Sequence, residues 1–303
     1  MTPLPRYPVY VISKGRHDRC LTSKFLRRDG VPHHVVVEPQ EADLYAGTVG
    51  ADRLLVLPFS NLGQGSIPAR NWLWEHSISG GHARHWCLDD NIRDTWRRFG
   101  MRKIRCQSNF AFACAERFVE RYENIGIIGL NYYMFAPYNR KMAPFYHNVH
   151  VYSFMCIDNS LPFRWRGRYN EDTDLCLQVL SSGLCTVLLN AFLAYKIPTM
   201  MMKGGNTDQL YAGDGRLKMA KSLERMWPGV VTVVRKFRRP QHSVKWGKFT
   251  TPLKLRPGSA PASGIDEMGM DLKMLKQPKN PKVARLYDRY HEGRAKCRAA
   301  SFS

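Results

Sequence analysis

His85-Trp86-Cys87-Leu88-Asp89-Asp90-Asn91-Ile92 is a short apolar run that passes directly into two carboxylates and an amide. The run predicts a buried strand, and the polar residues predict a turn at its carboxyl end. Hard oxygen donors in this position can hold Mg²⁺ or Mn²⁺. Such an ion usually keeps several water ligands and is also coordinated by the phosphates of a substrate. Asp89 and Asn91 are therefore candidate metal ligands. The alternative is a solvated turn, because Asp and Asn often bond nearby backbone groups.

A second acidic cluster, Asn170-Glu171-Asp172-Thr173-Asp174, lies about eighty residues later, at the predicted start of a helix. Sugar transfer to a hydroxyl group requires a carboxylate that accepts the hydroxyl proton. Asp172 is our first candidate for this base and Glu171 the second. The alternative is that these carboxylates only favour the positive end of a helix dipole. A metal–diphosphate site followed downstream by a carboxylate base is the arrangement that a nucleotide-sugar transferase needs.

The first two-thirds of the chain alternate between β-branched runs and helical patterns, which predicts an α/β domain. Strands are expected at 9–13, 34–38, 53–58, 85–88, 125–132, 149–157 and 184–189. Helices are expected at 20–29, 68–79, 108–123 and 172–182, with Ser108 as a helix N-cap and Gly183 as a helix end. A sheet with helices on both faces binds its ligands at the carboxyl ends of the strands.

Polar loops after the other expected strands supply further candidates. Ser13, Lys14 and Arg16 follow the first strand, where a loop can receive a nucleotide. Glu38 closes the second strand and can accept from a base N–H or a ribose hydroxyl. Arg70 can clamp a phosphate or a base with its guanidinium fork. The candidate nucleotide-sugar-binding set is Ser13, Lys14, Arg16, Glu38, Arg70, Asn71 and Asp90.

Composition narrows the classes of protein and of partner. The 303 residues are 44% apolar, and 46 basic against 25 acidic side chains give a net charge of +21, which favours a polyanionic partner. The eight cysteines include no C-x-x-C pair, so we expect no structural zinc site and a reduced, cytoplasmic protein. No signal peptide and no apolar stretch of membrane-spanning length is present in this sequence, so no membrane association is expected.

The chain changes character after residue 200. Segments 203–208 and 212–215 are rich in turn residues, and 235–256 holds eight basic residues and no acidic one. We expect a domain over 1–250 and a basic, partly extended segment over 251–303 with a short helix near 283–296. The candidate DNA-binding residues are Arg235, Lys236, Arg238, Arg239, Lys245, Trp246 and Lys248. A solvated basic tail is the alternative. His242 is a candidate third metal ligand, or an ordinary surface histidine.

Taken together, these segments resemble glycosyltransferases of the GT-A fold, and most of all the phage TET-associated glycosyltransferases that act on hypermodified DNA. The resemblance covers roughly residues 7–250. It rests on Tyr10-Val11-Ile12-Ser13-Lys14-Gly15-Arg16, on Gly65 to Asn71, on Leu88-Asp89-Asp90-Asn91 and on Tyr169-Asn170-Glu171-Asp172-Thr173-Asp174-Leu175. Asn91 departs from the usual Asp-x-Asp ending, which leaves the identity of the metal open.

The resemblance implies an α/β fold with a GT-A-type, Rossmann-like mixed sheet flanked by helices and a basic C-terminal extension. It implies a nucleotide sugar donor, most often a UDP-sugar, and 5-hydroxymethylcytosine in double-stranded DNA as acceptor, in the host cytoplasm if the protein is phage-encoded. Ser13, Arg16 and Glu38 would face the nucleotide. Asp89 and Asn91 would hold Mn²⁺ or Mg²⁺. Asp172 would be the base of an inverting transfer.

Three other functions stay open at the level of the sequence. One is the same fold acting on a protein or glycan acceptor, with the positive charge incidental. Another is a basic, non-enzymatic DNA-binding protein whose acidic clusters are only helix caps. The third is a metal-dependent nucleotidyltransferase or nuclease, which requires the two acidic clusters to converge on one site and usually binds two ions.

Overall fold

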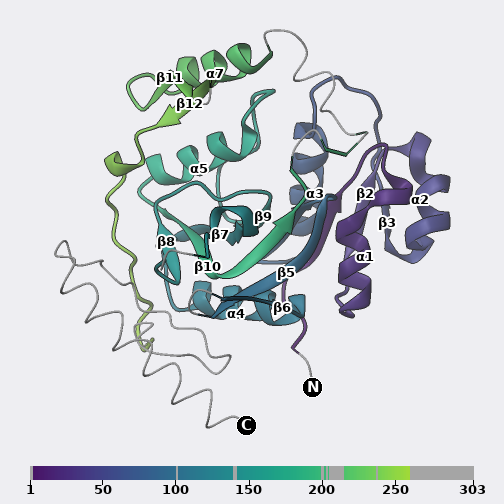
Figure 1. The fold of residues 1–303 in the computed structure, drawn as a ribbon. Coiled ribbons are helices and arrows are strands. Elements are labelled where there is room, and N and C mark those ends of the chain that lie inside the picture. The colour runs from purple at the N-terminus through teal and green to yellow at the C-terminus, as the bar shows by residue number, and fades with distance from the viewer. Residues whose placement is uncertain are drawn as a thin grey trace.

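A mixed ten-stranded sheet forms the centre of the protein. Nine strands follow the order β3-β2-β1-β4-β9-β7-β10-β5-β6, and β8 pairs with β10 outside this path. The structure is a computed structural model that describes residues 3–99, 102–138, 142–198, 201–202, 204, 215–236 and 238–259. Figure 1 shows helices on both sides of the sheet. The α/β fold with a mixed sheet, predicted from the sequence, is confirmed.

One half of the sheet is parallel. It consists of β1 (Val9–Ile12), β2 (His34–Val37), β3 (Leu54–Val56) and β4 (Arg84–Asp89). Three of these strands, β1, β2 and β4, are almost completely buried, as expected for parallel strands covered on both faces. Because parallel strands end at the same edge of a sheet, the polar residues that follow these strands come together there.

The other half of the sheet is largely antiparallel. β9 (Phe154–Asp158) lies antiparallel between β4 and β7 (Ile125–Tyr132), and β10 (Cys185–Lys196) runs parallel to β7. β5 (Ile92–Phe99) pairs antiparallel with β10 and with β6 (Arg102–Cys106), while β8 (Phe145–His147) pairs antiparallel with β10. The carboxyl ends of β7 and β10 therefore lie at the same edge of the sheet as the carboxyl end of β4.

Helices bury apolar side chains on each face of the sheet. α1 (Leu21–Arg28), α2 (Ala42–Val49) and α4 (Ser108–Glu120) pack in one core with Trp86 and Phe154. α3 (Ile67–Ser79) and α5 (Glu171–Ser181) pack in a second core with Tyr10 and Met155. The short 3₁₀ helices are η1 (His17–Arg19), η2 (Pro39–Glu41), η3 (Ala51–Arg53), η4 (Tyr133–Phe135) and η5 (Trp246–Lys248).

A small third layer lies against α5. It consists of α7 (Gly215–Met226) and the hairpin of β11 (Val231–Lys236) and β12 (Arg239–Val244). A separate apolar cluster of Leu177, Leu223 and Val231 joins this layer to α5. Figure 1 shows α7 and the hairpin together beyond α5. The hairpin carries the first residues of the basic stretch 235–256, so this stretch folds back onto the domain.

Some expectations about elements were wrong in detail, among them the strand expected at 184–189, which continues to Lys196. Ser108 is the first residue of α4 rather than its N-cap, and the Asp29 carboxylate accepts from both its N–H and its hydroxyl at 2.8 Å. The strand expected at 149–157 begins only at Phe154. Residues before it leave the sheet because His150 and Ser153 contact polar side chains of other elements.

The chain continues to pack on the domain beyond residue 250. The Glu123 N–H donates to the Lys254 carbonyl at 2.8 Å, and Leu253 and Leu255 pack against the first core. The boundary between a domain over 1–250 and a segment over 251–303 stays a prediction, and the helix expected at 283–296 lies outside the described residues, as does most of the turn-rich 203–215. None of the helices that the structure describes has the length and apolar character needed to cross a bilayer.

Candidate active site

A single cavity of about 360 Å³ lies at the carboxyl ends of β1, β2 and β4, within the size range of small-molecule sites. It brings together both acidic clusters, although they are far apart in the sequence. The predicted residues that line it are Ser13, Lys14, Arg16, Glu38, Arg70, Asp89, Asp90, Asn91, Glu171, Asp172 and His242. Asn71 does not line the cavity: its side chain bonds the backbone N–H and carbonyl of Trp165.

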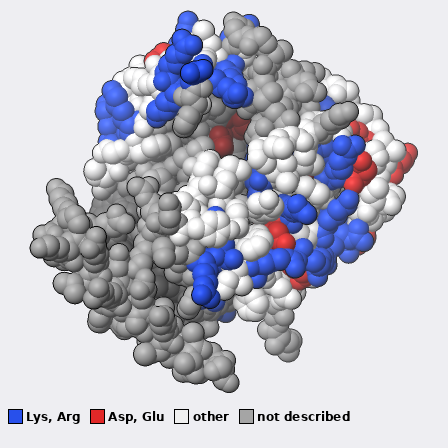
Figure 2. All heavy atoms as spheres, in the orientation of Figure 1, with Lys and Arg blue, Asp and Glu red and all other residues white. Residues whose placement is uncertain are grey.

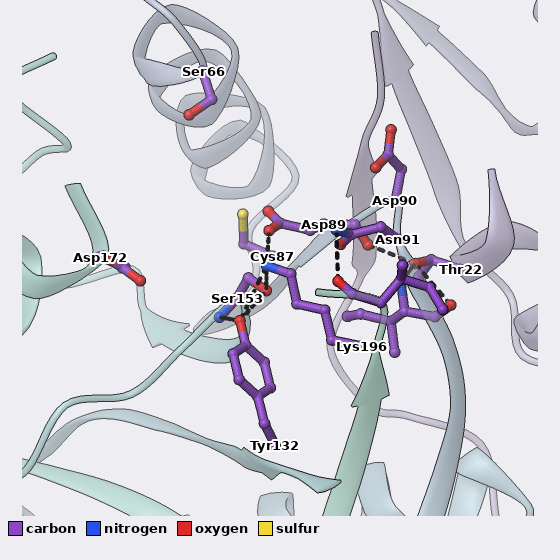
Figure 3. A network of polar contacts seen from close by, with 12 residues as sticks. Thr22, Ser66, Cys87, Asp89, Asp90, Asn91, Tyr132, Ser153, Asp172 and Lys196 are labelled. Atoms are coloured by element: carbon purple, nitrogen blue, oxygen red, sulfur yellow. Dashed lines mark hydrogen bonds and ion pairs between the residues drawn. The ribbon is translucent and has the colours of Figure 1, made fainter. Parts of the chain in front are cut away.

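Asp89, the last residue of β4, lies between two cations. Its Oδ1 accepts from Arg70 Nη2 at 2.8 Å, and its Oδ2 accepts from Lys196 Nζ at 2.7 Å. The Lys196 ammonium also donates to Ser153 Oγ at 2.9 Å and to Tyr132 Oη at 3.1 Å, as Figure 3 shows. Burial opposes ionisation of Asp89, but Lys196 and Arg70 outweigh it and lower the pKa of this carboxyl. Asp89 is therefore ionised at neutral pH.

Asp90 fixes the loop that follows β1. Its Oδ1 accepts from Arg16 Nη1 at 2.6 Å, and its Oδ2 accepts from Ser13 Oγ at 2.7 Å. Burial raises the pKa of Asp90, and Arg16 works in the opposite direction. Arg16 also donates to the Gly204 carbonyl at 2.8 Å. Gly204 has φ +84°, and a Cβ there would lie 2.4 Å from the Gly15 carbonyl oxygen, so only glycine allows this close approach.

Glu38 and Lys14 form a second pair at the same edge. Lys14 Nζ donates to Glu38 Oε2 at 2.6 Å and to Asn61 Oδ1 at 3.0 Å, and the Asn61 N–H donates to the other Glu38 oxygen at 3.2 Å. The pKa of Glu38 is lowered because Lys14 and other donors outweigh its burial. Near these charges, Ile12, Val36 and Leu57 line the cavity with apolar surface, which suits the face of a nucleoside base.

The second acidic cluster begins α5 and is held by contacts from α7, from α3 with its N-cap, and from the segment before β9. Asn170 precedes the helix in a left-handed conformation, and its amide donates to the Met219 carbonyl of α7 at 3.0 Å. Ser66 donates to Glu171 Oε1 at 3.1 Å, and His150 Nε2 lies 3.1 Å from Asp172 Oδ2. Arg70 joins the two clusters, because its Nε lies 3.9 Å from Glu171 while its Nη2 bonds Asp89.

Glu171 and Asp172 are adjacent, but their pKa values shift in opposite directions. Burial dominates at Glu171 and raises its pKa, with the charge of Asp172 adding to the effect. Burial also opposes ionisation of Asp172, but His150 and the Thr173 N–H, which donates at 2.7 Å, bring its pKa well below the usual range. Neighbouring groups whose environments separate their pKa values can take different roles in proton transfer. Asp172 is ionised at neutral pH and can accept a proton.

Asn91 and His242 have the features of metal ligands, whereas both oxygens of Asp89 already bond Arg70 and Lys196. Asn91 Oδ1 is buried and has no hydrogen-bond partner among the described residues, which suits a ligand atom. Burial and nearby His150 lower the pKa of His242, so its imidazole is in the neutral form that binds metals. Within the described part of the chain, no group of three His, Cys, Asp or Glu side chains could hold an ion by itself. An ion here would need Asn91, water and substrate phosphates.

The charges that line the cavity are balanced. Among the described residues that line it, the carboxylates are Glu38, Asp89, Asp90, Glu171 and Asp172, and the lysines and arginines are Lys14, Arg16, Arg70, Arg168 and Lys196. A nucleotide sugar would add the two negative charges of a diphosphate, and one divalent cation would offset them. Charge balance therefore also fits an ion that binds with the donor.

Several residues of the site were not predicted from the sequence. Lys196 follows the apolar run of β10, so the rule that selected Asp89, a polar residue at the carboxyl end of a buried strand, would have selected it too. His150 is not among the residues selected from the sequence, but it contacts Asp172. Ser66, from the segment Gly65 to Asn71, and Arg168, which precedes Tyr169, also line the cavity but were not selected as site residues.

The candidate DNA-binding cations are exposed on and after the β11–β12 hairpin. Arg235, Lys236, Arg238, Arg239, Lys245 and Lys248 are all exposed. Figure 2 shows Lys and Arg side chains gathered over α7 and this hairpin, with acidic side chains in the hollow beside them. Trp246 is half-buried and stacks on His150, with ring centroids 6.0 Å apart, so it packs within the fold. His242 belongs to the same strand β12 and links this basic surface to the cavity.

Comparison with known proteins identifies the family. The model of the TET-Associated Glycosyltransferase (TAGT) family matches residues 7–205, which is well over half of the chain. The match runs from before β1 to beyond Lys196 and so contains both acidic clusters, but not α7 or the basic hairpin. The comparison with curated proteins gave no match. The resemblance predicted from four short segments is therefore confirmed, and this chain belongs to the TET-associated glycosyltransferase family.

Proposed function

We propose that this glycosyltransferase transfers a sugar from a UDP-sugar to the hydroxymethyl group of 5-hydroxymethylcytosine in DNA. One observation carries the proposal: a single cavity holds cations beside the end of β4 and an ionised carboxylate at the start of α5. The first group suits a diphosphate and the second suits a hydroxyl acceptor. The net charge of +21 supports DNA as the molecule that carries this hydroxyl.

The donor would bind along the ends of β1, β2 and β4. Arg16, Arg70 and Lys196 line this part of the cavity and can donate to the diphosphate, since guanidinium and ammonium groups bind phosphate strongly. Ile12, Val36 and Leu57 offer apolar surface to the uracil ring, and Glu38 offers acceptor oxygens. When bound, Mn²⁺ or Mg²⁺ held by Asp89, Asn91 and His242 would act as a Lewis acid on the leaving diphosphate.

Asp172 would act as the base of an inverting transfer. Its carboxylate accepts the proton of the hydroxymethyl group, while the acceptor oxygen forms a bond with the anomeric carbon of the sugar. The bond between that carbon and the donor phosphate breaks, and its electron pair leaves with the nucleoside diphosphate. His150 holds the Asp172 carboxylate in place by the contact at 3.1 Å. Arg70 and Lys196 stabilise the charge that develops on the leaving group.

DNA would bind across the basic hairpin. Its cations are exposed, and strand β12 leads from Arg239 at the outer surface to His242 in the cavity wall. Neutralisation of phosphates by exposed cations provides affinity without sequence preference.

Mass spectrometry of nucleosides tests the proposal. DNA containing 5-hydroxymethylcytosine is incubated with the protein, Mn²⁺ and a panel of nucleotide sugars, and then digested. We expect a new nucleoside heavier by one sugar residue with a UDP-sugar, and none with unmodified DNA. A parallel reaction with EDTA should lose the product, and calorimetry of UDP with and without Mn²⁺ should show weaker binding without the ion. Transfer to a glycan or protein, but not to this DNA, would refute the proposed acceptor.

A further inference from the structure

Three aromatic side chains beside the cavity have no part in the proposed mechanism. Tyr132 ends β7, Phe135 ends η4, and Tyr152 precedes β9. The Tyr132 and Tyr152 rings stack with centroids 4.6 Å apart, and Phe135 contacts both rings, at 5.7 Å and 5.4 Å. These three rings contact one another, and we call them the aromatic shelf.

The shelf borders both halves of the catalytic site. The Tyr152 ring lies 4.5 Å from the His150 ring, and His150 contacts Asp172. On the other side, Tyr132 Oη bonds Lys196 Nζ at 3.1 Å and Ser153 Oγ at 2.7 Å, as Figure 3 shows. A group lying on the shelf would therefore be close to the proposed base and to the cation beside Asp89.

The outer end of the shelf is exposed and flanked by cations. Phe135 is 48% exposed, and its neighbour Met134 is equally exposed. Such contiguous apolar surface often marks a binding site. Tyr138, 56% exposed, lies at the end of the same segment, where Lys103 Nζ contacts its ring. Lys103 and the exposed Arg102 both belong to the edge strand β6.

We propose that the aromatic shelf is the platform on which the acceptor pyrimidine, extruded from the DNA, stacks. This inference rests on the proposed function. Asp172 lies inside the cavity, so a base paired within a duplex cannot reach it, and extrusion solves this problem for enzymes that modify bases. Every base has a π-face that stacks on aromatic rings. Sugar rings also pack on aromatic side chains, but the cations of β6 suit the phosphates on either side of an extruded nucleotide.

Phe135→Ala is the direct test, because this side chain is partly exposed and its loss is not expected to prevent folding. We expect the KM for DNA containing 5-hydroxymethylcytosine to rise about tenfold, which corresponds to the loss of one stacking contact. UDP affinity, measured by calorimetry, should stay within twofold of that of the parent protein. Phe135→Trp should keep the parent KM, since the larger ring also stacks. Leu44→Ala, at an exposed position of α2, is the matched control.

A second readout reports on the base itself. The fluorescence of 2-aminopurine placed next to the 5-hydroxymethylcytosine should increase when the parent protein binds, because extrusion of the neighbouring base unstacks the probe. The increase should be smaller with Phe135→Ala. An unchanged KM and an unchanged fluorescence signal in a folded Phe135→Ala variant would overturn the shelf alone. No transfer to this DNA by the parent protein would overturn the proposed function, and the shelf with it.

Discussion

At the scale of single residues, the site depends on two adjacent carboxylates in different environments. Glu171 lies near Arg70 and Ser66, and burial raises its pKa. Asp172 faces His150 and the Thr173 N–H, which keep it ionised although it is buried. Asp172 is therefore ionised over the physiological pH range, whereas burial of Glu171 favours its protonated form. The choice of Asp172 as first candidate, made on position in the sequence, stays a prediction that this difference supports.

Asp172→Asn should abolish most of the transfer activity. The amide has nearly the shape of the carboxyl but cannot accept the hydroxyl proton, so we expect kcat to fall by about 10²–10⁴-fold. UDP and DNA affinities should change little, because the Asp172 carboxylate makes its direct contacts with His150 and Thr173. Asp43→Asn, at an exposed position of α2, is the control. Turnover close to that of the parent protein would assign the base to another residue.

His150→Ala should move the acid limb of the pH profile. Burial alone raises the pKa of Asp172, and His150 is the largest influence that lowers it. Without His150 the pKa of Asp172 rises, so the carboxylate is protonated at a higher pH and the base is lost earlier as pH falls. We therefore expect the acid limb of kcat/KM to shift to higher pH. An acid limb at the parent position would show that His150 does not tune Asp172.

At the scale of helices and strands, buried elements could be predicted and polar edge elements could not. β1, β2, β4 and β7 are apolar runs, and α1, α3, α4 and α5 follow helical spacing, so all were expected close to their observed positions. β5 and β6, by contrast, contain the arginine-rich segments IRDTWRRF and RKIRC, which lack a strand pattern. They form because β10 offers an open edge, and this tertiary pairing is not encoded locally.

The same reasoning explains which parts of the site were missed. Asp89, Arg16 and Glu38 follow predicted strands, so topology alone brought them to one edge. Lys196 was missed because β10 was expected to stop at residue 189, whereas it continues through Ala191 and Phe192 between β7 and β5. His150 was missed because residues 149–153 were expected to be a strand. The errors in the site thus follow directly from errors in the bounds of two strands.

At the scale of the whole molecule, charge is divided between two regions. The described residues that line the cavity include as many carboxylates as lysines and arginines, so they add nothing to the formal net charge of +21. Exposed cations on β11, on β12 and around η5 contribute part of the excess. The family match ends at residue 205, before this region. The part of the chain most suited to DNA therefore lies outside the part that defines the family.

This division predicts that donor binding and DNA binding respond differently to salt. Replacing Lys245 and Lys248 together by Ala should weaken DNA binding and reduce the slope of log Kd against log salt by about 2, since each exposed cation releases about one counterion. UDP affinity should be unchanged, because neither lysine lines the cavity. Lys24→Ala combined with Arg27→Ala, on exposed positions of α1, removes the same charge elsewhere. If both double variants lower the slope equally, net charge rather than this surface governs DNA binding; a slope that neither variant changes would exclude phosphate contacts by Lys245 and Lys248.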